Sequence, residues 1–492
     1  MPSQVQSMPL SMSELDRAAW EAICHWQDHV QIQTVRAGID YAQLIRYSLW
    51  DKVSRAIRKK HDPIAFEFEA DLLDPNWGML QQNSLNPLKQ EAKRIQQLIH
   101  AVQDGLAIRS RKSPTLYVPC EHSALRRTVQ DIAHSVVTVV PYWAYEHQNN
   151  LSRFRPPLSK TRSTFALRLH QAVLEGLRAF EITLLDLDIE RLKRQIVQVV
   201  THIEQVKFEL KALRPDVILL FADNHYPVQT YVFVAQQMQI PVIMQQHGLD
   251  CEQYCLEEAY APIISVWGKA RCDRYCQNST WQPQTLQING NPEFDTLRAP
   301  EKLDLNGDYW LWVTRPHRPE KCFSPSRSPR EGIEILAALL QALMRSPSAR
   351  LVIKPHPLDH PDLYQTYVNE SNVRDRVEIT TAPAQSLLSD ASLVISEDST
   401  VGLEAMFFGK VVVHAHFAAS LPVLPFVKYE AALPGYSAEM LVSALEKQLS
   451  ETEQQSMWSG QQRFIQDYAG LCDGQSHQRM VRLIQQVLQQ SL

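Results

Sequence analysis

The sequence lacks several features that would assign it to a protein class at once. It has no basic excess, because 49 Lys and Arg stand against 54 Asp and Glu, and this balance argues against a dedicated nucleic-acid-binding protein. The apolar run at 136–145 is interrupted by Pro and Thr and falls short of the roughly 20 residues of a membrane-spanning helix. The N-terminal stretch lacks a basic segment followed by an apolar run, so we predict no signal peptide and expect a cytoplasmic protein.

The sequence has no P-loop pattern, which argues against an NTPase. Its cysteine count is ordinary for a chain of this length. The 8 cysteines suit a reducing compartment, where disulfides are rare. Four of them form two Cys-x-x-x-Cys pairs, Cys251 with Cys255 and Cys272 with Cys276. On helices each pair would share one face and could bind zinc or an iron–sulfur cluster. Independent buried thiols are the favoured interpretation, because zinc pairs more often use the tighter C-x₂-C spacing.

Residues 1–110 show no alternation of strands and helices, so we predict a helical N-terminal extension. Apolar residues recur at helical spacing from Leu15 to Trp26, and helices are also expected at 39–57 and 85–102. The basic run at 55–60 would allow peripheral contact with anionic lipid at the inner face of the membrane. A solvated helix face is the favoured interpretation of that run.

The rest of the chain alternates short apolar strands with helices, which predicts parallel sheets covered by helices on both faces. A turn-rich stretch at 288–308 divides it. We therefore predict an N-terminal Rossmann-like domain at 111–297 on the acceptor side and a C-terminal one at 298–492 on the donor side. Expected strands are 115–120, 135–140, 215–221, 240–245, 309–314, 351–353, 377–379, 393–395 and 411–414. Expected helices are 188–213, 228–238, 332–344, 384–388 and 400–408, followed by C-terminal helices.

The strongest candidate site is the sequence S-E-D-S-T-V-G-L-E-A at 396–405, where a strand passes into a helix. Backbone N–H groups at a helix start, beside the hydroxyls of Ser399 and Thr400, form an anion site. The helix dipole adds to the attraction for a negative group. Gly402 would let the backbone approach a ligand, and Glu404 would accept hydrogen bonds from ribose hydroxyls. Plain capping of the helix explains the same residues equally well.

Other candidates also follow expected strands, where ligands bind in open α/β sheets. Lys354 and His356 stand in K-P-H-P, a stiff loop that suits a diphosphate, although a surface histidine beside a turn is the alternative. His247 in Q-Q-H-G would serve as a general base near neutral pH, or would pack at the strand end. Asp223 and His225 follow an earlier strand and would bind acceptor or cap the next helix.

Taken in order, the motifs resemble a known group of enzymes. The series Q-H-G, G-N-P-x-F-D, K-P-H-P and S-x-x-S-T-x-G-L-E-A-x-x-x-G-K over 215–415 is similar to the capsule polysaccharide and CDP-glycerol glycerophosphotransferase group, which includes Kdo transferases. Several motifs in order are more specific than any one of them. The resemblance implies a GT-B fold, with two Rossmann-like domains facing across a cleft. It also implies a set of site residues, with donor binding by Lys354, His356, Ser399, Thr400 and Glu404 and catalysis by His247.

The motifs together predict a metal-independent transferase without a cofactor. It would move a glycosyl or glycerophosphoryl unit from a CMP-, CDP- or UDP-activated donor to a surface polysaccharide or glycolipid acceptor. His247 would take the acceptor proton, with Asp223 as second choice. His356 and Arg315, the latter from a basic loop, would help to stabilise the leaving phosphate. The D-x-D that begins at Asp186 lies at an expected helix start, so capping is favoured over metal binding.

Two other functions fit the same layout. A non-hydrolysing sugar-nucleotide epimerase would need no acceptor. A catalytically inactive relative would act as a scaffold in glycan assembly.

Overall fold

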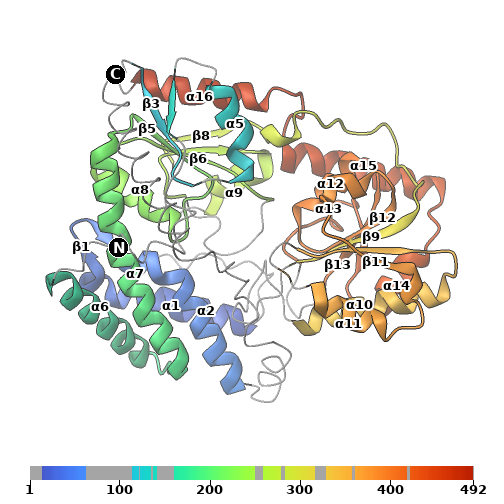
Figure 1. Cartoon of the computed structure of the whole chain (residues 1–492), viewed down its shortest axis with the longest axis horizontal. Helices are drawn as coiled ribbons and strands as arrows, with labels where there is room; N and C mark the ends of the chain where they lie inside the picture. Colours follow the sequence, from blue (N-terminus) through green and yellow to red (C-terminus); the bar gives the residue numbers. More distant parts are fainter. Residues whose placement is uncertain are drawn as a thin grey trace, which may run out of the picture.

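The structure is a computed structural model of the chain. It describes residues 14–61, 113–120, 122–133, 137–140, 160–249, 259–278, 283–315, 329–356, 359, 361–417 and 422–490. The helix expected at 85–102, the basic loop after Arg315, and Cys251 and Cys255 lie outside these residues. Two α/β units stand side by side, and long helices extend the N-terminal one (Figure 1).

The N-terminal unit contains a layer of long helices. They are α1 (Glu14–Thr34), α2 (Tyr41–His61), α6 (Lys160–Ala179) and α7 (Asp186–Leu213). Strands β1 (Val35–Arg36) and β2 (Ile39–Asp40) join α1 to α2 in a tight antiparallel turn. Trp26 is fully buried, and its indole N–H donates to the Val173 carbonyl on α6 at 3.2 Å. The predicted helical extension therefore shares one hydrophobic core with the neighbouring sheet.

The basic run on α2 is partly structural. Arg55 is buried and forms an ion pair with Asp188 in the first turn of α7, and the more exposed Arg191 lies 3.6 Å from the same carboxylate. Asp188 is therefore not the N-cap of a helix at 188–213 as predicted. The helix begins at Asp186 and its N-cap is Leu185, because the Asp188 carboxylate is held by arginines instead of by backbone N–H groups.

A parallel six-stranded sheet forms the centre of the N-terminal unit, in the order β4-β3-β5-β6-β7-β8. Its central strands are continuous apolar runs, as expected when both faces are covered by helices. The strands are β3 (Thr115–Tyr117), β4 (Thr138–Val140), β5 (Val217–Leu220), β6 (Val242–Gln245), β7 (Ile263–Val266) and β8 (Thr285–Ile288). The shorter helices are α5 (Ser123–Ala133), α8 (Val228–Gln237), α9 (Lys269–Asn278) and the 3₁₀ turn η1 (Pro292–Phe294).

The C-terminal unit repeats this plan, with a parallel six-stranded sheet in the order β11-β10-β9-β12-β13-β14. Its strands are β9 (Tyr309–Val313), β10 (Leu351–Lys354), β11 (Val377–Ile379), β12 (Ala391–Ser396), β13 (Val411–Ala415) and β14 (Leu433–Gly435). Its helices are α10 (Pro329–Arg345), α11 (Pro361–Asn369), η2 (Arg374–Arg376), α12 (Ala384–Leu388), α13 (Thr400–Phe407) and α14 (Ala438–Glu446).

The chain ends by crossing back to the N-terminal unit. Helix α15 (Glu451–Ala469) packs against α13 and α9, and α16 (Ser476–Gln490) lies on the N-terminal sheet (Figure 1). Asp295 in G-N-P-x-F-D accepts hydrogen bonds from the backbone N–H groups of Ser476 and His477, both at 2.9 Å. This motif therefore binds the start of α16 through hydrogen bonds, next to the chain segment that connects the two units.

The fold class predicted from the sequence is confirmed, since two Rossmann-like α/β units carry parallel sheets with helices on both faces. The strands expected near 217, 242, 309, 351, 377, 393 and 411 are present within a few residues. Strands β7, β8 and β14 were not predicted. No helix in the described part of the chain is long and apolar enough to cross a membrane.

Candidate functional site

Two candidate donor-binding segments follow the strands on either side of β9 in the C-terminal sheet. Lys354 and Ser396 are both in register with Val313 of the central strand β9, one on each side. Their backbones are therefore about 10 Å apart, since neighbouring strands are spaced by about 4.8 Å. The parallel strands all end at this edge, so the K-P-H-P loop and the start of α13 share one side of the unit.

Helix α13 begins with an open cap. Ser399 is the N-cap, and its hydroxyl oxygen accepts from the Val401 N–H at 3.4 Å. A helix start leaves several backbone N–H groups without intrahelical partners; here the capping bond satisfies that of Val401, and the Gly402 N–H donates to the Ser399 carbonyl at 3.1 Å. Capping and anion binding, the two alternatives for this motif, are therefore compatible here.

Hydrogen bonds fix the K-P-H-P loop where it follows β10. Lys354 is buried, its ammonium group donates to the Pro355 carbonyl at 2.9 Å, and burial lowers its pKa. The His356 N–H donates to the hydroxyl of Thr314 at 3.0 Å, and that hydroxyl donates to Asp359 at 2.8 Å. These bonds fix where the loop leaves the sheet, so His356 has a defined position at the edge.

Glu404 and Arg315 flank the same edge. Burial raises the pKa of Glu404, while a hydrogen bond from Gln385 on α12 opposes that shift. The Arg315 N–H donates to the buried Glu397 at 3.3 Å, and its Nη1 has no hydrogen-bond partner within the described residues. A buried guanidinium nitrogen without a partner is the kind of donor that an anion would satisfy.

The structure gives Gly402 a packing role that the sequence did not predict. A Cβ at this position would lie 2.8 Å from Phe426 Cζ and 2.9 Å from Ser396 Oγ. A glycine is needed here because the aromatic ring packs against the first turn of α13, and close approach of a ligand at Gly402 stays a prediction.

In the N-terminal unit, His247 lies in the loop that follows β6. Hydrogen bonds of neighbouring polar side chains fix this loop. Gln246 accepts from the Trp267 N–H at 2.8 Å and donates to the Gly248 carbonyl at 2.8 Å. Gln245 accepts from Thr128 at 3.0 Å and donates to the Ala124 carbonyl on α5 at 2.7 Å. The two glutamines of Q-Q-H-G are therefore anchors, which the sequence alone did not reveal.

The His247 ring has a defined tautomer. Its Nδ1 lies 2.8 Å from the Phe221 carbonyl oxygen, and a carbonyl can only accept, so Nδ1 carries the proton. Desolvation by the surrounding protein and the neighbouring His122 and His225 lower the pKa of His247, although the residue remains exposed. Nε2 of the neutral ring therefore offers a lone pair, while the lowered pKa makes the ring a weaker base near neutral pH than a free histidine.

Aromatic and imidazole rings surround this histidine. The His122 ring stacks on Phe221 at 4.4 Å and meets His247 edge-on at 5.1 Å between centroids. His122 opens α5 after β3, so three strands contribute to one cluster at this edge of the sheet.

The position of Asp223 does not suit the role of second-choice base that the sequence predicted for it. It is buried, and its Oδ2 accepts from the N–H groups of Tyr260 and Ala261 at 2.7 and 2.8 Å. Burial raises its pKa to about 6. These bonds tie the end of β5 to the segment before β7, which favours a structural role.

One contact joins the two edges. The Leu249 N–H, two residues after His247, donates to the Thr400 hydroxyl at 3.3 Å. Leu249 is buried in the same hydrophobic cluster as Trp267, Phe294 and residues of α13. The loop of the candidate base thus touches the start of the candidate donor helix.

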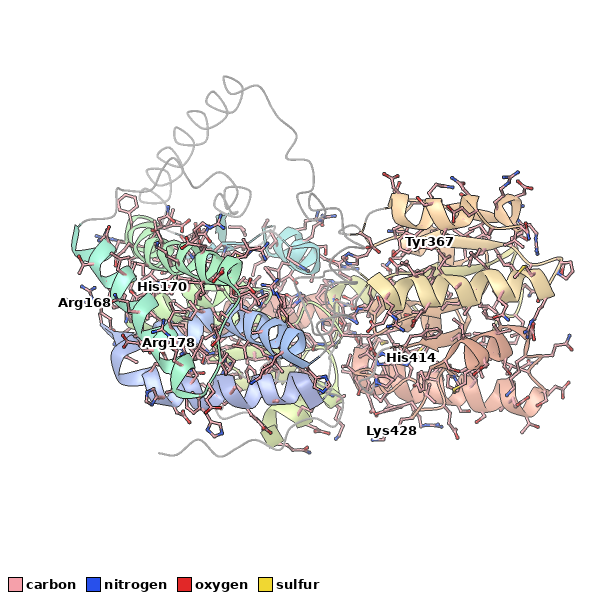
Figure 2. The ribbon with its side chains drawn as sticks, turned by 90° about the horizontal axis from the view of Figure 1, so that it is seen from below. Arg168, His170, Arg178, Tyr367, His414 and Lys428 are labelled. Carbon is pink, nitrogen blue, oxygen red and sulfur yellow. The ribbon has the colours of Figure 1, made fainter. Side chains whose placement is uncertain are left out.

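A buried acid between two histidines lies beside that helix start and was not predicted. Asp398 contacts His414 at 3.1 Å and His416 at 3.2 Å. The alternating V-V-V-H-A-H at 411–416 was the available signal, because every second residue of a strand shares a face. His414 lies inside the C-terminal unit in Figure 2.

The cysteine prediction is only partly covered by the described residues. Cys272 and Cys276 lie on α9, the first half-buried and the second exposed. Burial is the main cause that raises the pKa of Cys272. No group of three or more His, Cys, Asp or Glu that could hold a metal occurs in the described part of the chain.

Comparison with known proteins agrees with this arrangement. Residues 324–419 match the family model described as capsule polysaccharide biosynthesis protein. The match spans the K-P-H-P loop and α13, so it confirms the predicted resemblance over those residues. No curated protein matches the chain in sequence.

The chain is also similar to solved structures at low sequence identity. The S. aureus MnaA–UDP structure aligns with a TM-score of 0.50 and 15% identity, over 77% of this chain and 97% of that one. A putative UDP-N-acetylglucosamine 2-epimerase from Listeria monocytogenes gives 0.49 and 15%, over 77% and 98%. The lipopolysaccharide outer core galactosyltransferase WaaB gives 0.40 and 12%, over 75% and 99%.

Proposed function

We propose that the protein is a glycosyltransferase of capsule or surface-glycan biosynthesis. It transfers a glycosyl or glycerophosphoryl unit from a nucleotide-activated donor to a polysaccharide or glycolipid acceptor. The observation that carries the proposal is the hydrogen bond from Leu249 to Thr400. It sets a histidine with an available lone pair next to a helix start that suits a phosphate.

The chemistry follows from the two edges. The acceptor hydroxyl must lose a proton, and Nε2 of His247 is the group proposed to take it. The leaving nucleotide gains negative charge, which Lys354, His356, Arg315 and the open N–H groups at Ser399 and Thr400 would stabilise without a metal. Glu404 would accept hydrogen bonds from the ribose. The match to capsule polysaccharide biosynthesis over residues 324–419 supports the substrate class.

A nucleotide panel is the first test. We expect CMP, CDP, UDP or GDP to raise the melting temperature of the purified protein, and a matching sugar or glycerol donor to be consumed only with acceptor. UDP is the natural starting probe because the S. aureus MnaA structure of the same fold holds it. Failure of every nucleotide to stabilise the protein would contradict the proposal and favour the scaffold function.

The role of His247 has its own test. His247→Ala should lower turnover by about 10²–10⁴-fold, the usual contribution of a general base, with nucleotide affinity nearly unchanged. His61→Ala, at the exposed end of α2, is the matched control. Loss of nucleotide binding together with folding in His247→Ala would instead identify a structural residue.

The epimerase alternative makes a different prediction for the same samples. An epimerase would interconvert UDP-sugars in the absence of any acceptor, and the wild-type protein would show that conversion by NMR or chromatography.

A further inference from the structure

Two imidazole rings meet at the carboxyl edge of the N-terminal sheet. His122 follows β3, Phe221 follows β5 and His247 follows β6, and these three strands are neighbours in the sheet (Figure 1). The two imidazole centroids are 5.1 Å apart, and His122 is half-buried while His247 is exposed. Ligands of open α/β sheets bind outside this edge, so both rings are placed to contact the same ligand.

The two rings carry their protons on different nitrogens. Nδ1 of His122 accepts from the Ala124 N–H at 3.2 Å, so the proton of the neutral ring lies on Nε2. In His247 the proton lies on Nδ1, which donates to the Phe221 carbonyl at 2.8 Å. These are the only hydrogen bonds of the two side chains in the described part of the chain. Nε2 of His122 is therefore an unused donor, and Nε2 of His247 is an unused acceptor.

The surroundings of His122 favour a neutral ring in a fixed orientation. Burial lowers the pKa of His122. The ring also lies at the start of α5, where the positive end of the helix dipole disfavours an imidazolium. The stack on Phe221 and the hydrogen bond from Ala124 fix the plane of the ring. A neutral imidazole held at a helix start is well suited to donate a hydrogen bond to a substrate oxygen.

We propose that His122 binds the acceptor hydroxyl group, donating a hydrogen bond from Nε2 to the oxygen whose proton passes to Nε2 of His247. This inference rests on the proposed function and adds a second catalytic residue on the acceptor side. A hydroxyl group both donates and accepts, so it can bind the two imidazoles at once. A carboxylate or a phosphodiester has no proton to donate to His247, so this pair selects a sugar or polyol hydroxyl.

The pair supports the transfer step directly. The acceptor O–H bond breaks, its proton goes to His247, and the oxygen keeps the electron pair and bonds to the transferred carbon or phosphorus atom. The bond to the leaving nucleotide breaks, and the nucleotide takes the electron pair. Because the lowered pKa makes His247 a weak base, the reaction depends on stabilising the negative charge that develops on the acceptor oxygen. The Nε2–H of His122 supplies this stabilisation.

Nitrogen-15 NMR of the histidine-labelled protein tests the geometry without any ligand. Long-range proton–nitrogen spectra distinguish the two neutral tautomers of an imidazole ring, and His122→Asn and His247→Asn assign the signals. At neutral pH we expect the proton on Nε2 in His122 and on Nδ1 in His247. A His122 ring that carries its proton on Nδ1, or that is charged at neutral pH, would overturn the inference.

Turnover then tests the role of His122. Nucleotide release is followed from UDP-glucose, UDP-N-acetylglucosamine and CDP-glycerol, with methyl glycosides as hydroxyl acceptors. His122→Asn keeps an oxygen that can accept from the Ala124 N–H, as N-cap residues do, but it removes the donor that reaches the substrate. We expect kcat to fall by about 10²-fold, as for a lost donor to a developing negative charge. Affinity for UDP and the melting temperature should stay close to those of wild type.

Two further variants separate hydrogen-bond donation from packing. His122→Gln can place an amide N–H near the Nε2 position, so it should recover part of the lost turnover. His25→Asn is the matched control, because His25 is exposed and also stacks on a phenylalanine, Phe180, at 6.1 Å between centroids. This control should turn over like wild type.

The outcomes distinguish the two proposals. If wild type transfers and His122→Asn is equally fast, or His122→Gln is as slow as His122→Asn, this inference is overturned while the proposed function stands. If wild type consumes none of the donors, the proposed function fails and this inference fails with it.

Discussion

Replacing Gly402 by Ala separates a packing role from a ligand-binding role at the most informative motif of the chain. The new Cβ would lie 2.8 and 2.9 Å from two atoms of the Phe426 ring and 2.9 Å from Ser396 Oγ. The ring cannot easily withdraw, because Phe426 is fully buried and packs on Phe464 at 4.9 Å between centroids. The first turn of α13 must therefore shift.

The expected cost follows from two opposing effects. Overpacking a tight core costs up to about 3 kcal/mol, while Ala is favoured over Gly in a helix by about 1 kcal/mol. The net loss of about 2 kcal/mol corresponds to a melting temperature lower by about 4–8 °C for a domain of this size. Nucleotide affinity should fall as well, since the open N–H groups move with the turn.

Wild type and Gly402→Ala are compared by thermal unfolding, followed by circular dichroism, and by nucleotide titration on the same samples. Gly248→Ala is the control for stability, because a Cβ there meets nothing within 4 Å. If Gly402→Ala melts within about 1 °C of wild type but loses nucleotide affinity, the packing explanation is refuted and the glycine serves close approach of a ligand.

Two further predictions concern buried charges. Arg55→Met should destabilise the protein by about 3 kcal/mol in urea unfolding, because it leaves the buried Asp188 carboxylate without its nearest partner. Arg191→Met, which changes the more exposed partner, should cost less than about 1 kcal/mol. Equal effects of the two substitutions would contradict this ranking. The pKa of Asp398 is lowered in the folded state, so its contribution to stability is present above the unfolded pKa of about 4 and is lost as pH falls through the folded value. Asp398→Asn should therefore be less stable near neutral pH and less sensitive to acid, and an unchanged acid transition would refute that.

Much of the fold could be predicted because parallel strands covered on both faces are short, continuous apolar runs. That pattern located β5, β6, β9, β10 and β12 to within a few residues. It missed β7, where Ser265 interrupts the apolar run, and β8, where Thr285 and Gln287 alternate with apolar residues. It also could not show that α16 packs on the N-terminal sheet, because an amphipathic helix does not specify which apolar face it meets.

The order of short motifs by itself determined the resemblance and the candidate residues, since K-P-H-P and S-E-D-S-T follow strands and strand ends of a parallel sheet meet at one edge. Only the tertiary structure decided their tasks. It showed that Gly402 makes room for Phe426, that Asp223 binds backbone N–H groups, and that Asp398 pairs with two histidines. The physical reason is that a local pattern fixes which face a side chain takes, whereas its partners come from segments far away in the chain.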